Sequence, residues 1–229
     1  MIGKEKKLYR TLEILPGFLS WATLLALIIL SYFKPVEVAY FIIAFDVYWL
    51  LLVLYLGIHL VTSYKTLKKN TAVDWRRKCF ELKPEEIKTE KIKSWEEVIQ
   101  LIILPTYNES ADIIRSSLNG LVEGGYPPEK MIVALGIEER AGQEAVNRAE
   151  IIKKEYGSRF KYFTITIHPD GIIGELKGKG ANQSWIAKQV KKEIIDPQNL
   201  DYDKILTSVF DIDTVVHSGY FHCLTYKFL

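Results

Sequence analysis

Three short polar segments carry residue types that suit the binding of a nucleotide and a divalent cation. They are Pro105-Thr-Tyr-Asn-Glu109, Gly178-Lys-Gly-Ala-Asn182 and Asp211-Ile-Asp213. The first combines an aromatic ring with a carboxylate, the second combines glycines with a lysine, and the third is a pair of carboxylates. Each segment also has a plainer structural explanation, so the predicted chemistry depends on whether the fold brings the three together.

The first segment follows a short apolar run. Pro105 stiffens the exit from that run, Tyr107 offers a ring to a nucleobase, and Glu109 offers a carboxylate to ribose hydroxyl groups. The plainer explanation is an ordinary strand-to-helix turn in which Asn108 or Ser110 caps the helix.

The second segment, residues 178–182, precedes a predicted helix. Glycines before a helix N-terminus make an anion site, and Lys179 adds a positive charge. A P-loop would need glycine at the position of Ile173, and Ser or Thr at the position of Gly180. A dinucleotide-binding fingerprint would need glycine at the position of Gln183. Neither of these two better-known phosphate motifs is therefore present.

The third segment follows another apolar run. In extended chain, residues two positions apart point to the same side, so Asp211 and Asp213 can address one point. Paired carboxylates with open positions suit Mg²⁺ or Mn²⁺, which take their remaining ligands from water and substrate phosphates. The plainer explanation is a solvated acidic loop.

Strand-like and helix-like segments alternate from residue 98 onward. We expect strands at 98–104, 131–135, 160–167 and 205–210, and helices at 110–121, 143–156 and 181–193. This alternation predicts an α/β fold with a mostly parallel sheet. Because such sheets bind ligands beyond the carboxyl ends of their strands, the three polar segments are placed where a ligand would bind.

Two long apolar stretches precede this part of the chain. No charged side chain occurs from Ile14 to Phe33, and Asp46 is the only acidic residue from Val38 to Val61. A membrane-spanning helix needs about 20 apolar residues. We therefore expect an integral membrane protein with spans at about 14–33 and 38–61, rather than a cleaved signal peptide, for which no small-x-small cleavage site follows.

The distribution of basic residues predicts the orientation and the domain organisation. Lysine and arginine precede the first span and follow the second, whereas the only charged residues of the loop between the spans are Lys34 and Glu37. The positive-inside rule places the following domain in the cytoplasm, on the inner side of the cell membrane. We expect a membrane hairpin over 1–62, a charged juxtamembrane connector over 63–97, and a domain over 98–229. The connector is either a solvated linker or a segment that lies on an anionic leaflet.

The overall composition excludes several classes of protein. The 229 residues include 30 Lys and Arg against 28 Asp and Glu, a formal charge of +2. This balance argues against a basic nucleic-acid-binding surface, so no nucleic-acid partner is expected. The two cysteines, Cys79 and Cys223, match no metal or redox spacing, which excludes a disulfide framework.

Together and in this order, the three polar segments and the following Thr214 resemble the family 2 glycosyltransferases with a GT-A fold. The two apolar spans look like those of membrane-bound members such as cellulose synthase and hyaluronan synthase. The resemblance covers about residues 98–229. It implies transfer of a sugar, with inversion, from a nucleotide sugar, most simply a UDP-sugar, to a glycan or lipid acceptor.

The resemblance also implies roles for individual residues. The family has an acidic pair after the second strand, where this sequence has Gly136-Ile-Glu-Glu-Arg140, so Glu138 or Glu139 takes that position. The implied metal ligands for Mg²⁺ or Mn²⁺ are Asp211 and Asp213. The implied donor-binding residues are Pro105, Tyr107, Glu109, Glu138, Glu139, Lys179, Asn182 and Asp211.

The general base of this family is a later Asp, followed by a Gln-x-x-Arg-Trp segment, and the sequence contains neither. We therefore expect the base to lie beyond Leu229, which makes the chain the donor-binding half of a transferase. We also expect the apolar end, Phe221 to Leu229, to lack neighbours. The alternatives are a non-catalytic nucleotide-sugar-binding membrane subunit and a membrane-tethered signalling or scaffold protein.

Overall fold

The computed structural model describes residues 3–229, and it describes side chains from Lys7 onward. The basic side chains of Lys4 and Lys6, which contribute to the predicted orientation, lie outside that range. The chain divides between Lys68 and Lys69 into two compact units. Each unit is described by itself.

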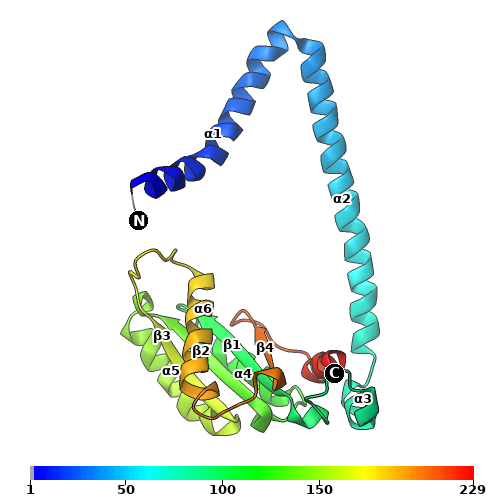
Figure 1. Ribbon diagram of the computed structural model, residues 1–229, viewed down its shortest axis with the longest axis vertical. Helices are drawn as coiled ribbons and strands as arrows, with labels where there is room; N and C mark the ends of the chain where they lie inside the picture. Colours follow the sequence, from blue (N-terminus) through cyan, green and yellow to red (C-terminus); the bar gives the residue numbers. More distant parts are fainter. Residues whose placement is uncertain (1–2) are drawn as a thin grey trace. The chain divides into compact units, whose positions relative to one another are not determined.

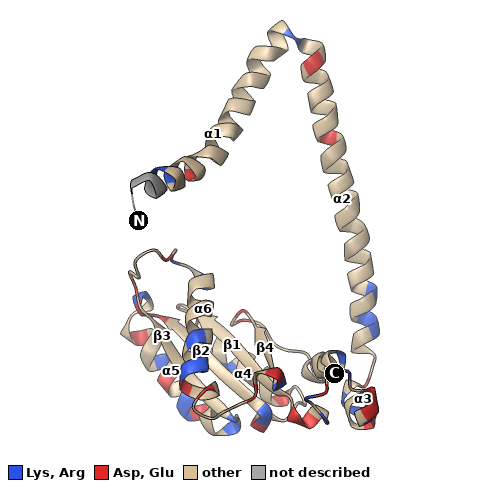
Figure 2. Cartoon of the chain, in the orientation of Figure 1, with Lys and Arg blue, Asp and Glu red and all other residues tan. Residues whose placement is uncertain are grey.

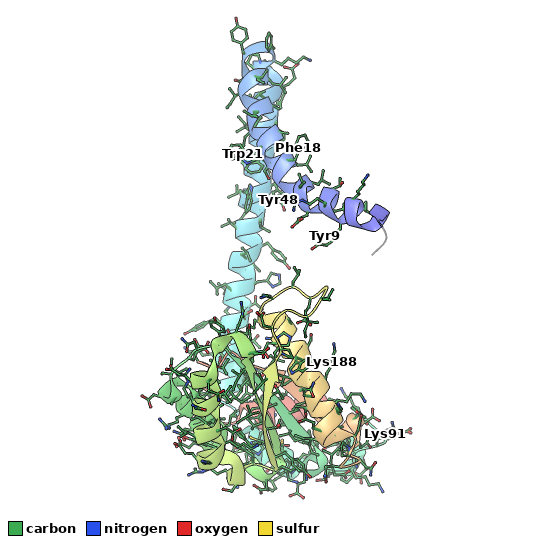
Figure 3. The ribbon with its side chains drawn as sticks, turned by 90° about the vertical axis from the view of Figure 1, so that its left-hand side faces the viewer. Tyr9, Phe18, Trp21, Tyr48, Lys91 and Lys188 are labelled. Atoms are coloured by element: carbon green, nitrogen blue, oxygen red, sulfur yellow. The ribbon has the colours of Figure 1, made fainter. Side chains whose placement is uncertain are left out.

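The first unit consists of two long helices (Figure 1), α1 (Gly3–Phe33) and α2 (Pro35–Thr71), joined at Lys34. Their apolar side chains project outward (Figure 3); Phe18 is 63% and Trp21 is 68% exposed. Both helices are long and apolar enough to cross a membrane. Charged residues are sparse along the apolar part of α2 and gather toward its C-terminal end (Figure 2), beyond the predicted span at 38–61.

The second unit is built on a four-stranded parallel sheet in the order β3-β2-β1-β4. The strands are β1 (Ile99–Thr106), β2 (Met131–Glu138), β3 (Tyr162–His168) and β4 (Ile205–Val209). After β3 the chain returns to place β4 on the other side of β1. The strand order therefore reverses at β1, which is where open parallel sheets bind their ligands.

Helices cover both faces of this sheet (Figure 1). Ile102 and Leu104 of β1 pack in one core with α4 (Ala111–Glu123) and α5 (Gln143–Tyr156). Leu101 and Ile103 point to the opposite face, where they pack with α6 (Lys179–Val190) and the π-helical turn that follows it. Alternate residues of a buried parallel strand serve two cores, which is why these strands are apolar throughout. The predicted α/β fold with a parallel sheet is confirmed.

The segment predicted as a charged connector contributes to the core of the second unit. It contains α3 (Trp75–Glu81) and two 3₁₀ turns, Pro84–Glu86 and Trp95–Glu97. Cys79, Ile92 and Trp95 are almost completely buried in the core on the α4 and α5 face. The compact unit therefore starts at Lys69 rather than at the expected residue 98.

The C-terminal segment packs against this same region. Helix α7 (Tyr220–Phe228) buries Phe221, which is 1% exposed, and Leu229 is 5% exposed. The backbone carbonyl of Leu229 also accepts a hydrogen bond from the N–H of Lys88 at 2.8 Å. The expectation that Phe221 and Leu229 lack neighbours is wrong, because the segment 75–97 supplies the surface against which they pack.

Candidate functional site

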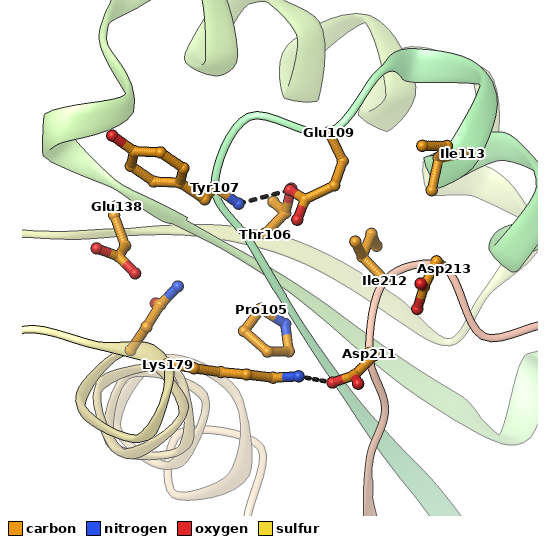
Figure 4. Close-up of a pocket in the computed structure, with 11 residues that line it drawn as sticks. Pro105, Thr106, Tyr107, Glu109, Ile113, Glu138, Lys179, Asp211, Ile212 and Asp213 are labelled. Carbon is orange, nitrogen blue, oxygen red and sulfur yellow. Dashed lines mark hydrogen bonds and ion pairs between the residues drawn. The ribbon is translucent and has the colours of Figure 1, made fainter.

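A cavity of about 370 Å³ opens beyond the carboxyl ends of β1, β2 and β4 (Figure 4). All three polar segments identified in the sequence contribute to its wall. The lining residues are Pro105, Thr106, Tyr107, Glu109, Ile113, Glu138, Lys179, Asn182, Asp211, Ile212 and Asp213. The cavity therefore occupies the place where the strand order reverses.

Pro105 lies inside β1 rather than after it, because β1 runs to Thr106. The carbonyl of Ile103 accepts a hydrogen bond from the N–H of Phe210, so residues 103 and 105 both direct their backbone groups toward the β4 edge. Strand β4 pairs with β1 only as far as Ile103. The missing N–H of Pro105 consequently costs no ladder hydrogen bond, and the β1 backbone is left open to the cavity.

The Glu109 carboxylate is held in place by its own loop. It accepts hydrogen bonds from Thr106 Oγ1 at 2.6 Å and from the backbone N–H of Tyr107 at 2.7 Å. Burial alone would raise the pKa of Glu109, but these hydrogen bonds outweigh it and the pKa lies below its ordinary value. Glu109 is thus an ionised acceptor facing the cavity at neutral pH.

Tyr107 presents its ring at the mouth of the cavity and is 45% exposed. The guanidinium of Arg140 lies 5.0 Å from the centre of that ring and forms an ion pair with Glu138. Glu138 lies in the cavity wall, whereas Glu139 accepts a hydrogen bond from the backbone N–H of Asp170 at 2.8 Å. Of the two alternatives left open by the sequence, the structure places Glu138 in the cavity.

Helix α6 enters the site with Lys179 as its first residue, close to the predicted start. Asn182 is 1% exposed and donates from Nδ2 to the backbone carbonyl of Gly136 in β2 at 3.2 Å. A Cβ at Gly136 would lie 2.1 Å from Cδ1 of Ile186. Glycine at this position therefore permits the close approach of α6 to the sheet that brings Lys179 and Asn182 to the cavity.

The sequence predicts extended chain at Asp211 and Asp213, but the structure has a turn there. Strand β4 ends at Val209, and the N–H of Thr214 donates to the carbonyl of Asp211 at 2.9 Å, which closes a turn. Ile212 is buried at 4% exposure and anchors this turn, while Asp211 and Asp213 both line the cavity. Asp211 forms an ion pair with Lys179 (Figure 4).

The donor set at this turn is compatible with a divalent cation that is completed by its ligand. Within residues 3–229, no group of three or more His, Cys, Asp or Glu side chains is arranged to hold a metal by itself. Two carboxylates beside an open cavity match the way Mg²⁺ is commonly held, with one or two carboxylates and the remaining ligands from water and phosphate. Any cation bound here would therefore depend on a phosphate-bearing ligand.

The cavity also includes residues that the sequence did not single out. Thr106, Ile113 and Ile212 line it, and Arg140 covers Tyr107 from outside it. Position alone could have suggested Thr106 and Ile212, because each lies between residues that were identified. Arg140 carried no such signal, since its place above the Tyr107 ring depends on the path of the 3₁₀ turn Glu139–Ala141.

Comparison of the chain with protein-family models finds no match, and comparison with curated protein sequences finds no match either. The functional argument consequently depends on the residues and geometry of the site.

Proposed function

We propose that residues 69–229 form the nucleotide-sugar-binding part of a membrane-anchored glycosyltransferase with a GT-A-type fold. The observation that carries the proposal is the convergence of the three polar segments on one cavity, at the reversal of strand order in a parallel sheet. The wall of this one cavity combines an aromatic ring, carboxylates and a lysine, which are the groups that a nucleotide and its divalent cation require. The donor we propose is a UDP-sugar.

The nucleoside end of the donor is assigned to the β1 side of the cavity. The exposed ring of Tyr107 offers a stacking surface for a base, in competition with the Arg140 guanidinium that covers it at 5.0 Å. The ionised Glu109 carboxylate, fixed by two hydrogen bonds, accepts from ribose hydroxyl groups. Glu138 lies across the cavity from Glu109 and contributes a second acceptor for the nucleoside.

The diphosphate end is assigned to Lys179, Asp211 and Asp213. Lys179 lies at the N-terminus of α6, where the positive end of the helix dipole adds to its own charge. Asp211 and Asp213 would hold Mg²⁺ or Mn²⁺, which when bound stabilises the negative charge on a leaving diphosphate. Lys179, now paired with Asp211, would exchange that carboxylate for a phosphate oxygen when the donor binds.

Transfer to a glycan or lipid acceptor hydroxyl, with inversion at the sugar, also requires a general base. The alternative function, a nucleotide-sugar-binding membrane subunit without transfer activity, uses the same cavity. Release of UDP from a UDP-sugar in the presence of acceptor separates the two, because only the transferase produces it above the rate of spontaneous hydrolysis.

The membrane anchor is assigned to the two helices of the first unit. Both are long and apolar enough to span a bilayer, and the only charged residues where they meet are Lys34 between them and Glu37 in the first turn of α2. Following the positive-inside rule, we place the nucleotide-sugar site in the cytoplasm, on the inner side of the cell membrane.

The proposal is tested by measuring the affinity of the detergent-solubilised full chain for UDP-sugars in Mn²⁺, with Lys179→Gln and Lys177→Gln compared. Both variants lose one positive charge near the start of α6, but only Lys179 lines the cavity, whereas Lys177 pairs with Asp170 at 2.6 Å. We expect Lys179→Gln to weaken binding by about tenfold or more and Lys177→Gln to bind like the wild type. Equal affinities for the two variants would show that Lys179, at the start of α6, does not contribute to donor binding.

A further inference from the structure

Helices α3 and α7 pack against each other in the second unit (Figure 1), although they are more than a hundred residues apart in the sequence. The thiol of Cys79 in α3 donates to the backbone carbonyl of His222 in α7 at 3.3 Å. The ring centres of Trp75 and Tyr226 lie 5.5 Å apart. This contact therefore brings side chains from two distant segments to one surface.

Two lysines and two aromatic rings meet on that surface. Lys78 Nζ lies 5.5 Å from the centre of the Trp75 ring and 5.5 Å from that of the Tyr226 ring, and Lys227 Nζ lies 5.6 Å from the Trp75 ring. Both lysines are exposed and both rings are half-buried. These four residues form the basic–aromatic cluster. None of the four lines the proposed donor cavity, so nucleotide-sugar binding does not explain why they gather.

The basic–aromatic cluster has a surplus of positive charge. Among the side chains that the structure describes, no ion pair joins Lys78 or Lys227 to a carboxylate. The carboxylates nearest to Lys78 in the sequence are held within α3. Asp74 accepts from the backbone N–H of Arg77 at 3.0 Å, and Glu81 pairs with the Arg77 side chain at 2.6 Å. Two ammonium groups beside one ring repel each other, so an anion next to them would be attracted by both.

The cluster also lies next to the end of α2. The indole N–H of Trp75 donates to the backbone carbonyl of Asn70, in the last turn of α2, at 2.7 Å. Lys65 is the first Lys or Arg of α2, and Asn70 lies about 8 Å further along the helix. The headgroup region of one leaflet is itself about 5–8 Å thick. If α2 spans the membrane, chain continuity therefore keeps the cluster close to the headgroups.

We propose, on the basis of the membrane anchor in the proposed function, that the basic–aromatic cluster binds anionic lipid headgroups. Tryptophan and tyrosine favour the interface between hydrocarbon and water, and lysine is attracted to the negative surface potential of a leaflet that contains phosphatidylserine. The chain that leads into the cluster adds positive charge through Lys65, Lys68, Lys69, Arg76 and Arg77. Of the two roles that the sequence leaves open for the connector, contact with an anionic leaflet thus gains a partner surface from α7.

The test measures how fast a water-soluble acetylating reagent modifies individual lysines of the full chain in lipid nanodiscs, read out by mass spectrometry. Nanodiscs of phosphatidylcholine alone are compared with nanodiscs that also contain phosphatidylserine. Lys188 is the internal control (Figure 3), because it is exposed on α6, which packs on the opposite face of the sheet from α3 and α7. We expect phosphatidylserine to slow the modification of Lys78 and Lys227 by about threefold or more and to leave Lys188 unchanged. High salt should remove this protection, because it screens the attraction.

Two matched variants test whether charge causes the protection. Lys227→Gln removes one charge of the basic–aromatic cluster, and Lys188→Gln removes one from α6. Both lysines are exposed, so neither change should disturb folding. We expect Lys227→Gln to reduce the protection of Lys78 by about twofold or more, and Lys188→Gln to leave it as in the wild type.

Equal modification rates of Lys78 and Lys227 in the two kinds of nanodisc would overturn the proposal and leave the surface open to a protein partner. Equal effects of Lys227→Gln and Lys188→Gln would also overturn it. If the chain does not enter nanodiscs, the membrane anchor fails and the lipid contact fails with it. UDP-sugar affinity, measured on the same samples, reports separately on the donor site.

Discussion

Replacement of Gly136 by alanine should damage the fold and the candidate site together. A Cβ at this position would lie 2.1 Å from Cδ1 and 2.3 Å from Cγ1 of Ile186, and 3.0 Å from Oδ1 of Asn182. Real Cβ contacts are not this short, so the buried Ile186 side chain must be displaced, and we expect α6 to shift away from β2 with it. Since α6 carries Lys179 and Asn182 into the cavity, its displacement is expected to weaken ligand binding as well as packing.

The size of the effect follows from known costs of overpacking. Adding a methyl group to a filled core costs about 1–3 kcal/mol, which for a unit of this size corresponds to a decrease of about 2–12 °C in unfolding temperature. Ile186→Ala should itself cost about 2–5 kcal/mol, because it leaves a cavity. In the double variant the new methyl group occupies part of that cavity. The two changes should therefore cost at least about 1 kcal/mol less together than the sum of the single changes.

The assay is thermal and denaturant unfolding of both single variants and the double variant, alongside UDP-sugar affinity. Gly180→Ala is the matched control: apart from its chain neighbours and the backbone of its own helix, no described atom lies within 4 Å of a Cβ there, and Gly180 lies inside α6. Alanine at that helical position should be neutral or stabilising by about 0.5–1 kcal/mol. If Gly136→Ala keeps wild-type stability and affinity, the contact of α6 with β2 does not position the site.

Three further outcomes are expected. Glu109→Gln should lower the stability of the protein at neutral pH, because the depressed pKa of Glu109 in the folded state means that its ionised form stabilises the fold. The difference from the wild type should shrink as the pH falls through this pKa, which lies below the ordinary value of about 4.3. Unfolding measured between pH 7 and pH 3 checks this. Trp95→Ala should cost about 3–5 kcal/mol in denaturant unfolding, whereas Glu90→Ala, an exposed change in the same segment, should cost almost nothing. In intact cells, a membrane-impermeant maleimide should label Lys34→Cys but not Ile173→Cys, which is fully exposed on the second unit; the reverse pattern would contradict the proposed orientation.

The sheet and its covering helices could be predicted because their apolar periodicities are local. The run from Ile99 to Leu104 is apolar at every position except Gln100, which indicates a strand buried on both faces, and the expected helix at 143–156 agrees with α5. The candidate site could be predicted for a geometric reason. Parallel strands end at one edge, so polar segments that follow several strands must meet there.

The packing of the segment 75–97 could not be predicted in the same way. Its buried residues, among them Cys79, Ile92 and Trp95, are widely spaced between charged side chains and follow no helical or strand period. Their partners, Phe221 and Leu229, are more than a hundred residues away in the sequence. Each half of this contact looks unpartnered by itself, so the sequence predicts a connector for one and an exposed apolar end for the other.

The turn at 211–214 illustrates a different limit. Sequence spacing placed Asp211 and Asp213 on one side only if the chain stayed extended, and a hydrogen bond from Thr214 to Asp211 closes a turn instead. Both carboxylates still line the cavity because Ile212 is buried between them.

The central claim, a cation-dependent nucleotide-sugar site at the end of β4, is tested most directly by two aspartate variants. Asp213→Asn removes a cavity carboxylate, whereas Asp203→Asn removes one that lies before β4 and forms an ion pair with Lys91. Calorimetric titration with UDP in Mn²⁺ should show affinity reduced about tenfold or more by Asp213→Asn, unchanged by Asp203→Asn, and equally weak for the wild type and Asp213→Asn when Mn²⁺ is chelated. Equal affinities of the two variants in Mn²⁺ would contradict the account.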